Sequence, residues 1–175
     1  MTKKGFEKHG FLERHIKDNK VEKIMEIGVY NGENAKNMIK TAIRTIKNPN
    51  ITYYGFDTFD DTFNNNLQEV RKKLSKLNSK VFLFQGDSKD TLPQAIDDLP
   101  EMDLIFIDGE HSYETVKSDW NEAKKLMKEN THVFFHNYEK SGVEKVVNNI
   151  PKTSYSVKIL NPASDLKTAK VTGTR

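Results

Sequence analysis

The stretch Glu26-Ile27-Gly28-Val29-Tyr30-Asn31-Gly32 joins an apolar run, residues 21–27, to an amphipathic run, residues 33–46. The apolar run has the length and aliphatic character of a buried strand, and the second run repeats its apolar residues at helical spacing. A strand, a turn with two glycines and a helix in this order are typical of the first unit of a nucleotide-binding α/β domain. The stretch therefore predicts both a fold class and the place of a ligand site.

The residues of this glycine loop indicate how it would meet a ligand. Gly28 permits a tight turn, and Gly32 permits close approach where the helix begins and its backbone amides are exposed. Glu26, just before the turn, suits a cationic ligand group. Tyr30 stands where dinucleotide-binding loops have their middle glycine, which argues against a pyrophosphate ligand. We predict that the loop, including Tyr30 and Asn31, binds a ligand; the alternative is a turn that only links strand to helix.

The rest of the chain continues the alternation of strand and helix. Four more apolar runs have the length of buried strands: residues 51–56, 81–84, 102–107 and 132–135. Two further segments, residues 67–77 and 113–127, have apolar residues at helical spacing. Strands that are apolar throughout are typical of parallel sheets covered on both faces. The pattern predicts a doubly wound, Rossmann-like α/β sheet with right-handed crossovers.

The two ends of the chain complete this architecture. Residues 6–19 predict a leading helix, and residues 142–149 predict a short helix that ends before a proline. Residues 154–160 and 166–172 predict two strands whose short, turn-rich link makes them antiparallel neighbours. We therefore expect a seven-stranded sheet, five parallel strands plus a C-terminal antiparallel strand pair, in one domain. Its expected parts are a leading helix over 1–20, a cofactor-binding core over 21–150 and a closing strand pair over 151–175.

The composition narrows the functional classes. The 175 residues include 28 basic and 25 acidic ones, and the net charge of +3 gives no strong attraction to nucleic acid or anionic membranes. The absence of cysteine excludes disulfides and thiolate chemistry and fits a cytoplasmic protein. The N-terminus lacks a signal core, and no apolar run approaches the ~20 residues of a membrane helix. We expect a cytoplasmic protein with no nucleic-acid or membrane partner.

Asp57, followed by Thr58, ends the second predicted strand about 25 residues after the glycine loop. In dinucleotide-binding folds, an acidic residue about 20 residues after the glycine loop holds the ribose hydroxyls. One carboxylate accepts two hydrogen bonds from a vicinal diol. We therefore predict ribose binding at Asp57 and Thr58; the alternative is an aspartate that only caps a turn.

Asp87 and Ser88 follow the third predicted strand in the sequence Gln85-Gly86-Asp87-Ser88. The carboxylate at this edge could accept a hydrogen bond from an adenine amino group. Both residue types are also preferred N-caps of helices. The sequence leaves the two interpretations of this pair equally open.

The fourth and fifth predicted strands deliver further polar residues to the same edge of the sheet. Asp108 and His111 follow residues 102–107, and His136 and Asn137 follow residues 132–135. A carboxylate, two imidazoles and an amide could form a metal site or supply a general base. The alternative for each single histidine is a capping or surface residue.

Taken together, these motifs resemble those of one known family. The resemblance is carried by the glycine loop and by Gly55-Phe56-Asp57, Gly86-Asp87-Ser88, Ile107-Asp108-Gly109-Glu110-His111-Ser112-Tyr113 and His136-Asn137-Tyr138. In order and spacing they are similar to class I S-adenosylmethionine-dependent methyltransferases, over about residues 21–147. The most similar subgroup is a small one with an Asp-Gly-x-His-Ser-Tyr motif, related to macrocin-type O-methyltransferases.

The resemblance implies S-adenosyl-L-methionine as the cofactor. It places Glu26 and Gly28 at the methionine part, Asp57 at the ribose, and Asp87 with Ser88 at the adenine. In metal-dependent relatives, an acid after the fourth strand and an Asp-Asn or His-Asp pair after the fifth approach Mg²⁺ and the acceptor.

Asp108 matches the first metal position of these relatives, but His136 and Asn137 match the second only in part, because the usual aspartate is missing. Since Mg²⁺ prefers oxygen ligands, these residues make a thin shell, and a divalent metal is left open. The implied catalytic step is proton removal from the acceptor by His111 or His136, with Asp108 orienting the histidine.

The predicted function is transfer of a methyl group from S-adenosyl-L-methionine to a small molecule, at a hydroxyl oxygen. One alternative is a non-catalytic cofactor-binding module, favoured by the short chain and by Asn137. A nucleotide-linked oxidoreductase is the other, and Tyr30 and the closing strand pair argue against it. Residues 60–66 are either part of an acceptor wall or a polar loop, and a homo-oligomeric partner could complete the pocket.

Overall fold

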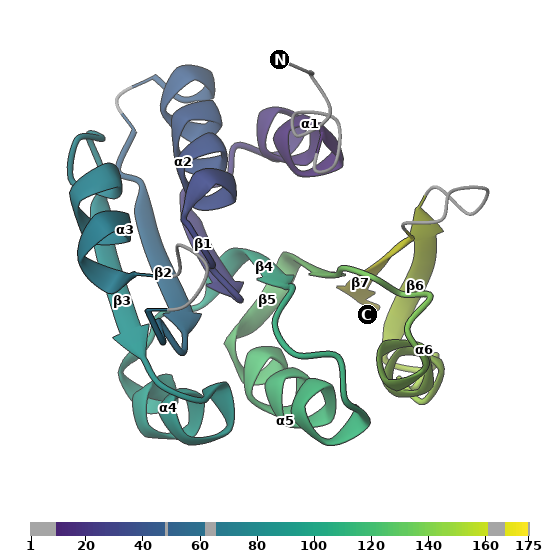
Figure 1. The fold of residues 1–175 in the computed structure, drawn as a ribbon. Helices are drawn as coiled ribbons and strands as arrows, with labels where there is room; N and C mark the ends of the chain where they lie inside the picture. The colour runs from purple at the N-terminus through teal and green to yellow at the C-terminus, as the bar shows by residue number, and fades with distance from the viewer. Residues whose placement is uncertain (1–9, 48, 62–65, 161–166, 175) are drawn as a thin grey trace, which may run out of the picture.

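The computed structural model describes residues 10–47, 49–61, 66–160 and 167–174. They form one seven-stranded sheet with the order β3-β2-β1-β4-β5-β7-β6 (Figure 1). Neighbouring strands among the first five pair in parallel, and β7 pairs antiparallel with both β5 and β6. The predicted fold class is therefore confirmed. The strands are β1 (Lys23–Ile27), β2 (Thr52–Asp57), β3 (Lys80–Gln85), β4 (Met102–Ile107), β5 (Met127–Phe135), β6 (Tyr155–Leu160) and β7 (Thr168–Gly173).

Helices cover both faces of this sheet (Figure 1). They are α1 (Gly10–Asn19), α2 (Glu33–Thr45), α3 (Leu67–Leu74), α4 (Ser88–Ala95), α5 (Tyr113–Ala123) and α6 (Ser141–Asn148). Five of them lie where the apolar spacing predicts a helix, whereas α4 has no counterpart in the prediction. Only Leu92 of α4 is fully buried, and Pro93 lies inside it, so its sequence lacks a clear apolar face.

The predicted boundaries differ most where the helix after β4 meets β5, which begins at Met127 and not at residue 132. Helical spacing suggests a helix over residues 113–127, but α5 ends at Ala123 and a 3₁₀ turn, η3 (Lys124–Leu126), follows. Met127 already belongs to β5 and pairs with Met102 of β4. Thr131 stabilises this irregular start of the strand, because its hydroxyl donates to the Met102 carbonyl over 2.5 Å.

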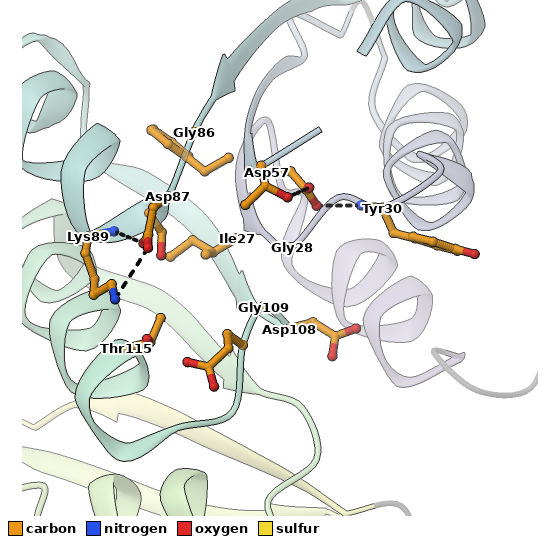
Figure 2. Close-up of a pocket in the computed structure, with 14 residues that line it drawn as sticks. Ile27, Gly28, Tyr30, Asp57, Gly86, Asp87, Lys89, Asp108, Gly109 and Thr115 are labelled. Carbon is orange, nitrogen blue, oxygen red and sulfur yellow. Dashed lines mark hydrogen bonds and ion pairs between the residues drawn. The ribbon is translucent and has the colours of Figure 1, made fainter. Parts of the chain in front are cut away.

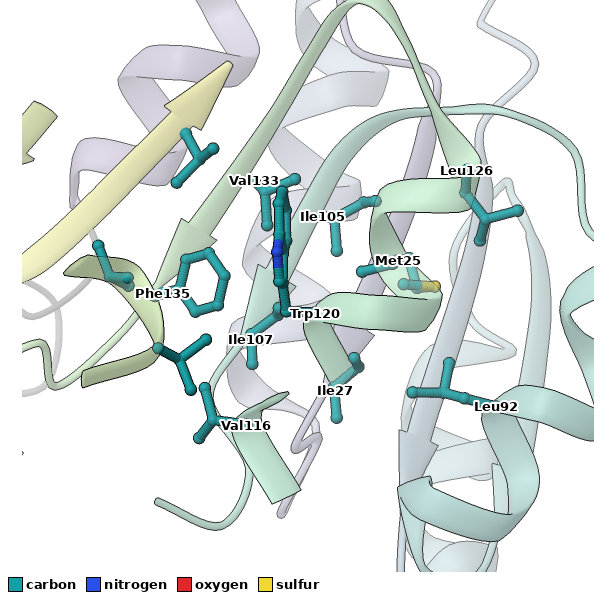
Figure 3. Close-up of a cluster of buried hydrophobic side chains, with 14 of the residues drawn as sticks. Met25, Ile27, Leu92, Ile105, Ile107, Val116, Trp120, Leu126, Val133 and Phe135 are labelled. Carbon is teal, nitrogen blue, oxygen red and sulfur yellow. The ribbon is translucent and has the colours of Figure 1, made fainter. Parts of the chain in front are cut away.

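Two hydrophobic cores hold the helices against the sheet. On one face, residues of α4, α5 and α6 pack around Trp120, whose ring lies 5.7 Å from that of Phe135 (Figure 3). Residues of α1, α2 and α3 bury the other face, with Leu12, Met38 and Val70 among those fully buried. Both faces of the parallel strands are thus covered, as their apolar sequences require.

The strand order reverses direction at β1. The chain proceeds from β1 to β2 and β3 on one side, and then crosses to β4 and β5 on the other. Open α/β sheets bind ligands at the carboxyl ends of the strands beside such a switch point. Within the described part of the chain, no helix has the length and apolar character needed to cross a membrane.

Candidate functional site

Backbone hydrogen bonds extend the sheet one residue beyond several strand ends. The amides of Gly86, Asp108 and His136 each donate to the last carbonyl of a neighbouring strand, and the Gly28 amide donates to the second-last carbonyl of β2, over 2.8 to 3.0 Å. Each of these residues is therefore fixed at the carboxyl edge of the sheet. The polar residues that the sequence places after separate strands meet at this edge.

Gly28 is where the glycine loop meets the end of β4. Its φ is +91°, and a Cβ atom at this position would lie 2.3 Å from the Asp108 carbonyl oxygen. Any side chain would therefore both strain the backbone and collide with the neighbouring chain. The glycine is required by the close approach of the loop to β4.

Asp57 holds the glycine loop in place from the end of β2. Its Oδ2 atom accepts hydrogen bonds from the amides of Val29 (2.7 Å) and Tyr30 (2.8 Å). Oδ1 accepts from the amide of Phe59 (3.0 Å) and, more distantly, from the hydroxyl of Thr58 (3.3 Å). Tyr30 has a φ of +52°, which is unusual for a residue with a side chain, so these bonds stabilise a strained loop.

A pocket of about 540 Å³ lies at this edge (Figure 2). Its volume falls within the usual range for small-ligand sites. The predicted site residues that line it are Gly28, Tyr30, Asp57, Thr58, Asp87, Ser88 and Asp108. The other six predicted residues do not line it: Glu26, Asn31, Gly32, His111, His136 and Asn137.

Glu26 is buried behind the pocket. Its side chain accepts a hydrogen bond from the Asn34 side chain of α2 (2.6 Å) and another from the Tyr53 hydroxyl of β2. Burial raises the pKa of Glu26 to about 8, although both hydrogen bonds favour the charged form. Both oxygens are engaged by the protein, so this residue braces β1, β2 and α2 and is not exposed to the pocket.

Asn31 and Gly32 shape the passage from the loop into α2. The Asn31 side chain accepts from the Glu33 amide (3.1 Å), and its carbonyl accepts from the Lys73 ammonium group (2.5 Å). Gly32 precedes α2 in the left-handed region, with a φ of +72°. These two residues therefore support the glycine loop from the side away from the pocket lining.

Asp87 is the N-cap of α4 and also lines the pocket. Its side chain accepts from the Lys89 amide (2.9 Å) and forms an ion pair with the Lys89 ammonium group (3.4 Å) (Figure 2). Ser88, the first residue of α4, lines the pocket beside it. Asp87 therefore caps α4, as one of the two interpretations expects, and both side chains still line the pocket.

Asp108 and His136 are brought together by the parallel pairing of β4 and β5. Asp108 Oδ1 lies 2.8 Å from His136 Nδ1. Asp108 is partly exposed and lines the pocket, whereas His136 is only 2% exposed. This is the aspartate-histidine pair that the sequence predicts at this edge.

His111 occupies a different environment. A Cβ atom on Gly142 would lie 2.2 Å from the His111 carbonyl, so α6 packs tightly on this loop. The His111 Nε2 atom is buried, and no described residue forms a hydrogen bond with it. His111 does not line the pocket, unlike Asp108 of the Asp108–His136 pair.

Asn137 turns its side chain toward Glu139. Its amide nitrogen donates to one Glu139 oxygen (3.1 Å), while the other accepts from the Lys167 amide (2.9 Å). The φ of Asn137 is +53°, a region that asparagine tolerates better than most residues. No group of three or more histidine or carboxylate side chains suited to a metal occurs in the described ranges. Asn137 is engaged through its amide nitrogen, so the metal role that the sequence left open for Asp108, His136 and Asn137 stays a prediction.

Several site residues were not predicted from the sequence. Lys89, Gly109, Glu110 and Thr115 also line the pocket, and all follow closely on strand ends. Glu110 accepts from the Ser112 amide (2.9 Å), and its bonds to Ser112 and Thr115 lower the pKa of its carboxyl group. Gly109 and Glu110 lie in the turn after β4, and Lys89 and Thr115 lie in the first turns of α4 and α5. Their position after β3 and β4 was the available signal, because this part of each unit is close to the sheet edge.

The chain matches a family model described as a methyltransferase domain, over residues 25–138. The match covers more than half of the chain, and the protein belongs to this family of methyltransferase domains. No curated protein matches the chain.

Solved structures with a similar fold are themselves methyltransferases. An O-methyltransferase from Bacillus cereus in complex with SAH has a TM-score of 0.75 and 16% identity, covering 93% of this chain and 79% of that one. CalS11, a TDP-rhamnose 3'-O-methyltransferase of calicheamicin biosynthesis, has a TM-score of 0.72 and 18% identity, covering 91% and 75%. TomG from Streptomyces achromogenes in complex with SAM has a TM-score of 0.72 and 13% identity, covering 94% and 78%. At these identities the likeness establishes the fold.

Proposed function

We propose that this protein transfers a methyl group from S-adenosyl-L-methionine to a hydroxyl oxygen of a small molecule. The observation that carries the proposal is the convergence of Gly28, Asp57, Ser88 and Asp108 on one pocket in a member of a methyltransferase family. The O-methyltransferases of similar fold, two of them solved with SAH or SAM, support the choice of cofactor and of acceptor atom.

The pocket offers a separate contact for each part of this cofactor. The glycine loop at Gly28 and Tyr30 would meet the methionine part, with Glu26, Asn31 and Gly32 acting as its support. Asp57 and Thr58 would hold the ribose hydroxyls, since both line the pocket at the end of β2. Asp87 and Ser88 would meet the adenine. When bound, the cofactor supplies an electrophilic methyl group on a sulfonium.

The acceptor side of the proposal rests on the Asp108–His136 pair. If Nδ1–H of His136 donates to Asp108, the imidazole is held in the tautomer whose Nε2 atom can take a proton from an acceptor hydroxyl. Since His136 is only 2% exposed and Asp108 lines the pocket, the acceptor would have to reach the histidine beside Asp108. The deprotonated oxygen then forms its bond to the methyl carbon as the carbon–sulfur bond breaks. This assigns the base to His136 and the orienting role to Asp108, and it routes no step through a metal.

The test is methyl transfer from cofactor with a deuterated methyl group to a panel of sugars, phenols and amines, followed by mass spectrometry. We expect a labelled ether on at least one hydroxyl compound. A labelled amine would contradict the choice of oxygen. Cofactor binding without transfer to any acceptor, including an extract of small metabolites, would favour a non-catalytic cofactor-binding module.

Three further parts of the proposal concern the protein's surroundings. The balanced charge supports a small-molecule acceptor over nucleic acid. The absence of cysteine supports a cytoplasmic location. A homo-oligomer in which a second copy completes the acceptor pocket is also proposed, and light scattering during size-exclusion chromatography tests it through the molar mass.

A further inference from the structure

The outer side of β3 is an open edge of the sheet (Figure 1). β3 pairs only with β2, and the amides of Lys80 and Gly86 donate to carbonyls on that side. Because the N–H groups of a strand alternate between its two sides, the amides and carbonyls of Val81, Leu83 and Gln85 point outward. No described residue forms a backbone hydrogen bond with these outward groups. Such a row of unpaired groups is a template for another strand.

Phe82, in the middle of this strand, is an exposed apolar side chain. Its exposed fraction is 47%, and among the described residues Tyr30 is the only other large hydrophobic side chain with so high an exposure. The Phe82 ring stacks on that of Tyr54 of β2, with the centroids 5.3 Å apart. Phe84 stacks in the same way on Phe56, at 4.4 Å. Two aromatic rows thus cross from β2 and end at the open edge.

The edge at β3 lacks the usual protection against pairing. Its only charged residue, Lys80, is at the first position of the strand, whereas β6 at the opposite edge has Lys158 in its middle. A groove of about 510 Å³ lies between β3 and the end of α3, where Arg71 and Ser79 line it. The Ser79 hydroxyl is buried in this region without a hydrogen bond to any described residue. β3 is therefore the more open of the two edges.

We propose that β3 pairs antiparallel with β3 of a second copy of this chain about a two-fold axis, which joins the two seven-stranded sheets into one. The inference goes beyond the proposed function and does not rest on it, because the interface needs neither cofactor nor acceptor. It places the second copy at the β3 edge, which β2 and β1 separate from the strands that carry Asp108 and His136.

The outward groups determine the register of this pairing. An antiparallel pair hydrogen-bonds where outward-facing residues lie opposite one another. Centring the two-fold axis on Leu83 places Val81 opposite Gln85 of the second copy, so every outward amide and carbonyl of β3 finds a partner. Phe82 then lies opposite Phe84 of the second copy, which removes the exposed ring from water and adds an aromatic cross-strand pair.

Charge complementarity favours a second copy as the partner. In this register the exposed Lys80 faces Gly86 of the second copy and lies beside its Asp87. The Asp87 side chain is about half exposed, and its ion pair with Lys89 spans 3.4 Å, so it is accessible to a further cation. The two-fold axis repeats this contact at the other end of the strand. Such self-complementarity is what an isologous interface requires.

Sedimentation velocity over a range of about 1 to 300 µM protein tests the pairing. We expect a monomer–dimer equilibrium with a dissociation constant on the order of 10 µM, because one strand pair is a small interface. Phe82→Lys puts a charge opposite Phe84 of the second copy and should weaken the dimer by about 10-fold or more. Ser156→Lys, the same charge at an exposed position of β6, is the matched control and should leave the constant unchanged. Equal effects of the two variants would overturn the inference.

Charge reversal tests the register. Lys80→Glu should weaken the dimer by about 5-fold, because it brings two carboxylates together, and adding Asp87→Lys should restore most of that loss. A double variant that is weaker than Lys80→Glu alone would overturn the pairing of these two positions.

Amide hydrogen exchange at residue resolution locates the interface without any substitution. The amides of Val81, Leu83 and Gln85 should exchange about 10-fold more slowly in concentrated than in dilute protein. Those of Phe82 and Phe84, which face β2, are the internal control and should change little. A chain that stays monomeric, assembles beyond a dimer, or dimerises without protection of the three outward amides would overturn the inference.

Discussion

The two sides of the pocket differ in how their buried acids are satisfied. On the β1–β2 side, Glu26 is bonded to Asn34 and Tyr53, and Asp57 accepts the amides of the glycine loop. On the side formed by α4 and α5, Asp119 is as deeply buried as Glu26 but completes no standard hydrogen bond with the described residues.

This difference suggests a division of labour. Groups that are paired within the protein hold a binding surface in shape before a ligand arrives, which lowers the entropic cost of binding. A buried carboxyl group that lacks a partner instead costs stability. We therefore expect the β1–β2 side to determine cofactor affinity and Asp119 to affect mainly the stability of the fold.

The largest predicted effect is a loss of turnover, from a substitution that should leave both sides of the pocket intact. His136→Ala removes the proposed base and should lower the rate of methyl transfer by about 100-fold or more, because general bases contribute on that order. Binding of S-adenosylhomocysteine should change little. A loss of turnover in His111→Ala, with His136→Ala unaffected, would assign the base to the other predicted histidine.

The next largest effect comes from a substitution that disrupts the glycine loop on the β1–β2 side of the pocket. Gly28→Ala places a methyl group 2.3 Å from the Asp108 carbonyl at a φ of +91°, so the loop must move away from β4. We expect cofactor affinity to fall by about 100-fold and the unfolding free energy by about 2 kcal/mol or more, measured by calorimetry and chemical denaturation. Gly109→Ala is the matched control, since its Cβ would meet nothing closer than 3.5 Å. Equal losses in the two variants would contradict a special role for Gly28.

A third prediction compares one aspartate from each side. Asp57→Ala removes the acceptor of two loop amides and should weaken binding of S-adenosylhomocysteine by about 30-fold. Asp87→Ala removes an ion pair that is about half exposed, and should weaken it by only about 3-fold. Calorimetric titration of both variants and the wild-type protein with S-adenosylhomocysteine measures the two losses of affinity. A larger loss in Asp87→Ala would reverse the proposed division of labour.

The last effect concerns the pH dependence of stability and separates the two buried acids. The pKa of Glu26 is about 8 in the folded protein, above its ordinary value of 4.5, so folding favours the protonated form. Stability from this group is therefore fully present at low pH and is lost as the pH rises toward 8, by about 2 kcal/mol between pH 6 and 8. Glu26→Gln has no such proton to lose and should show a flatter profile of unfolding free energy.

Asp119 provides the contrast, because its pKa of about 7 places the corresponding loss at lower pH. Asp119→Asn should therefore flatten the profile mainly below pH 7, and Glu26→Gln should flatten it up to pH 8. Identical profiles in the two variants and in wild type would show that neither acid is protonated in the folded state.

The sequence predicts the sheet well because each parallel strand contains an apolar run. It predicts the polar sheet edge because each of these five strands has an acid or a histidine at its end or within two residues of it. It does not predict the partners of Glu26, since Asn34 lies in the next helix and Tyr53 lies 27 residues away. Only the packing of β1 against β2 and α2 brings them together. From its position at the end of β1, Glu26 was expected to contact the ligand. The side chain is instead buried and does not line the pocket.

Asp119 could have been noticed from the sequence. Thr115, Asp119 and Ala123 are four residues apart and share a buried face of α5, where an acid stands out among smaller residues. Its complete burial could not have been predicted, because it depends on how α4 packs against α5, and α4 itself has too weak an apolar pattern to be predicted.

The most direct test of the central claim is a calorimetric titration of the wild-type protein with S-adenosylhomocysteine, with NAD as the comparison. We predict saturable binding of one S-adenosylhomocysteine per chain and no measurable binding of NAD, because the loop at Tyr30 departs from the dinucleotide pattern. Binding of NAD without binding of S-adenosylhomocysteine would contradict the assignment of the pocket.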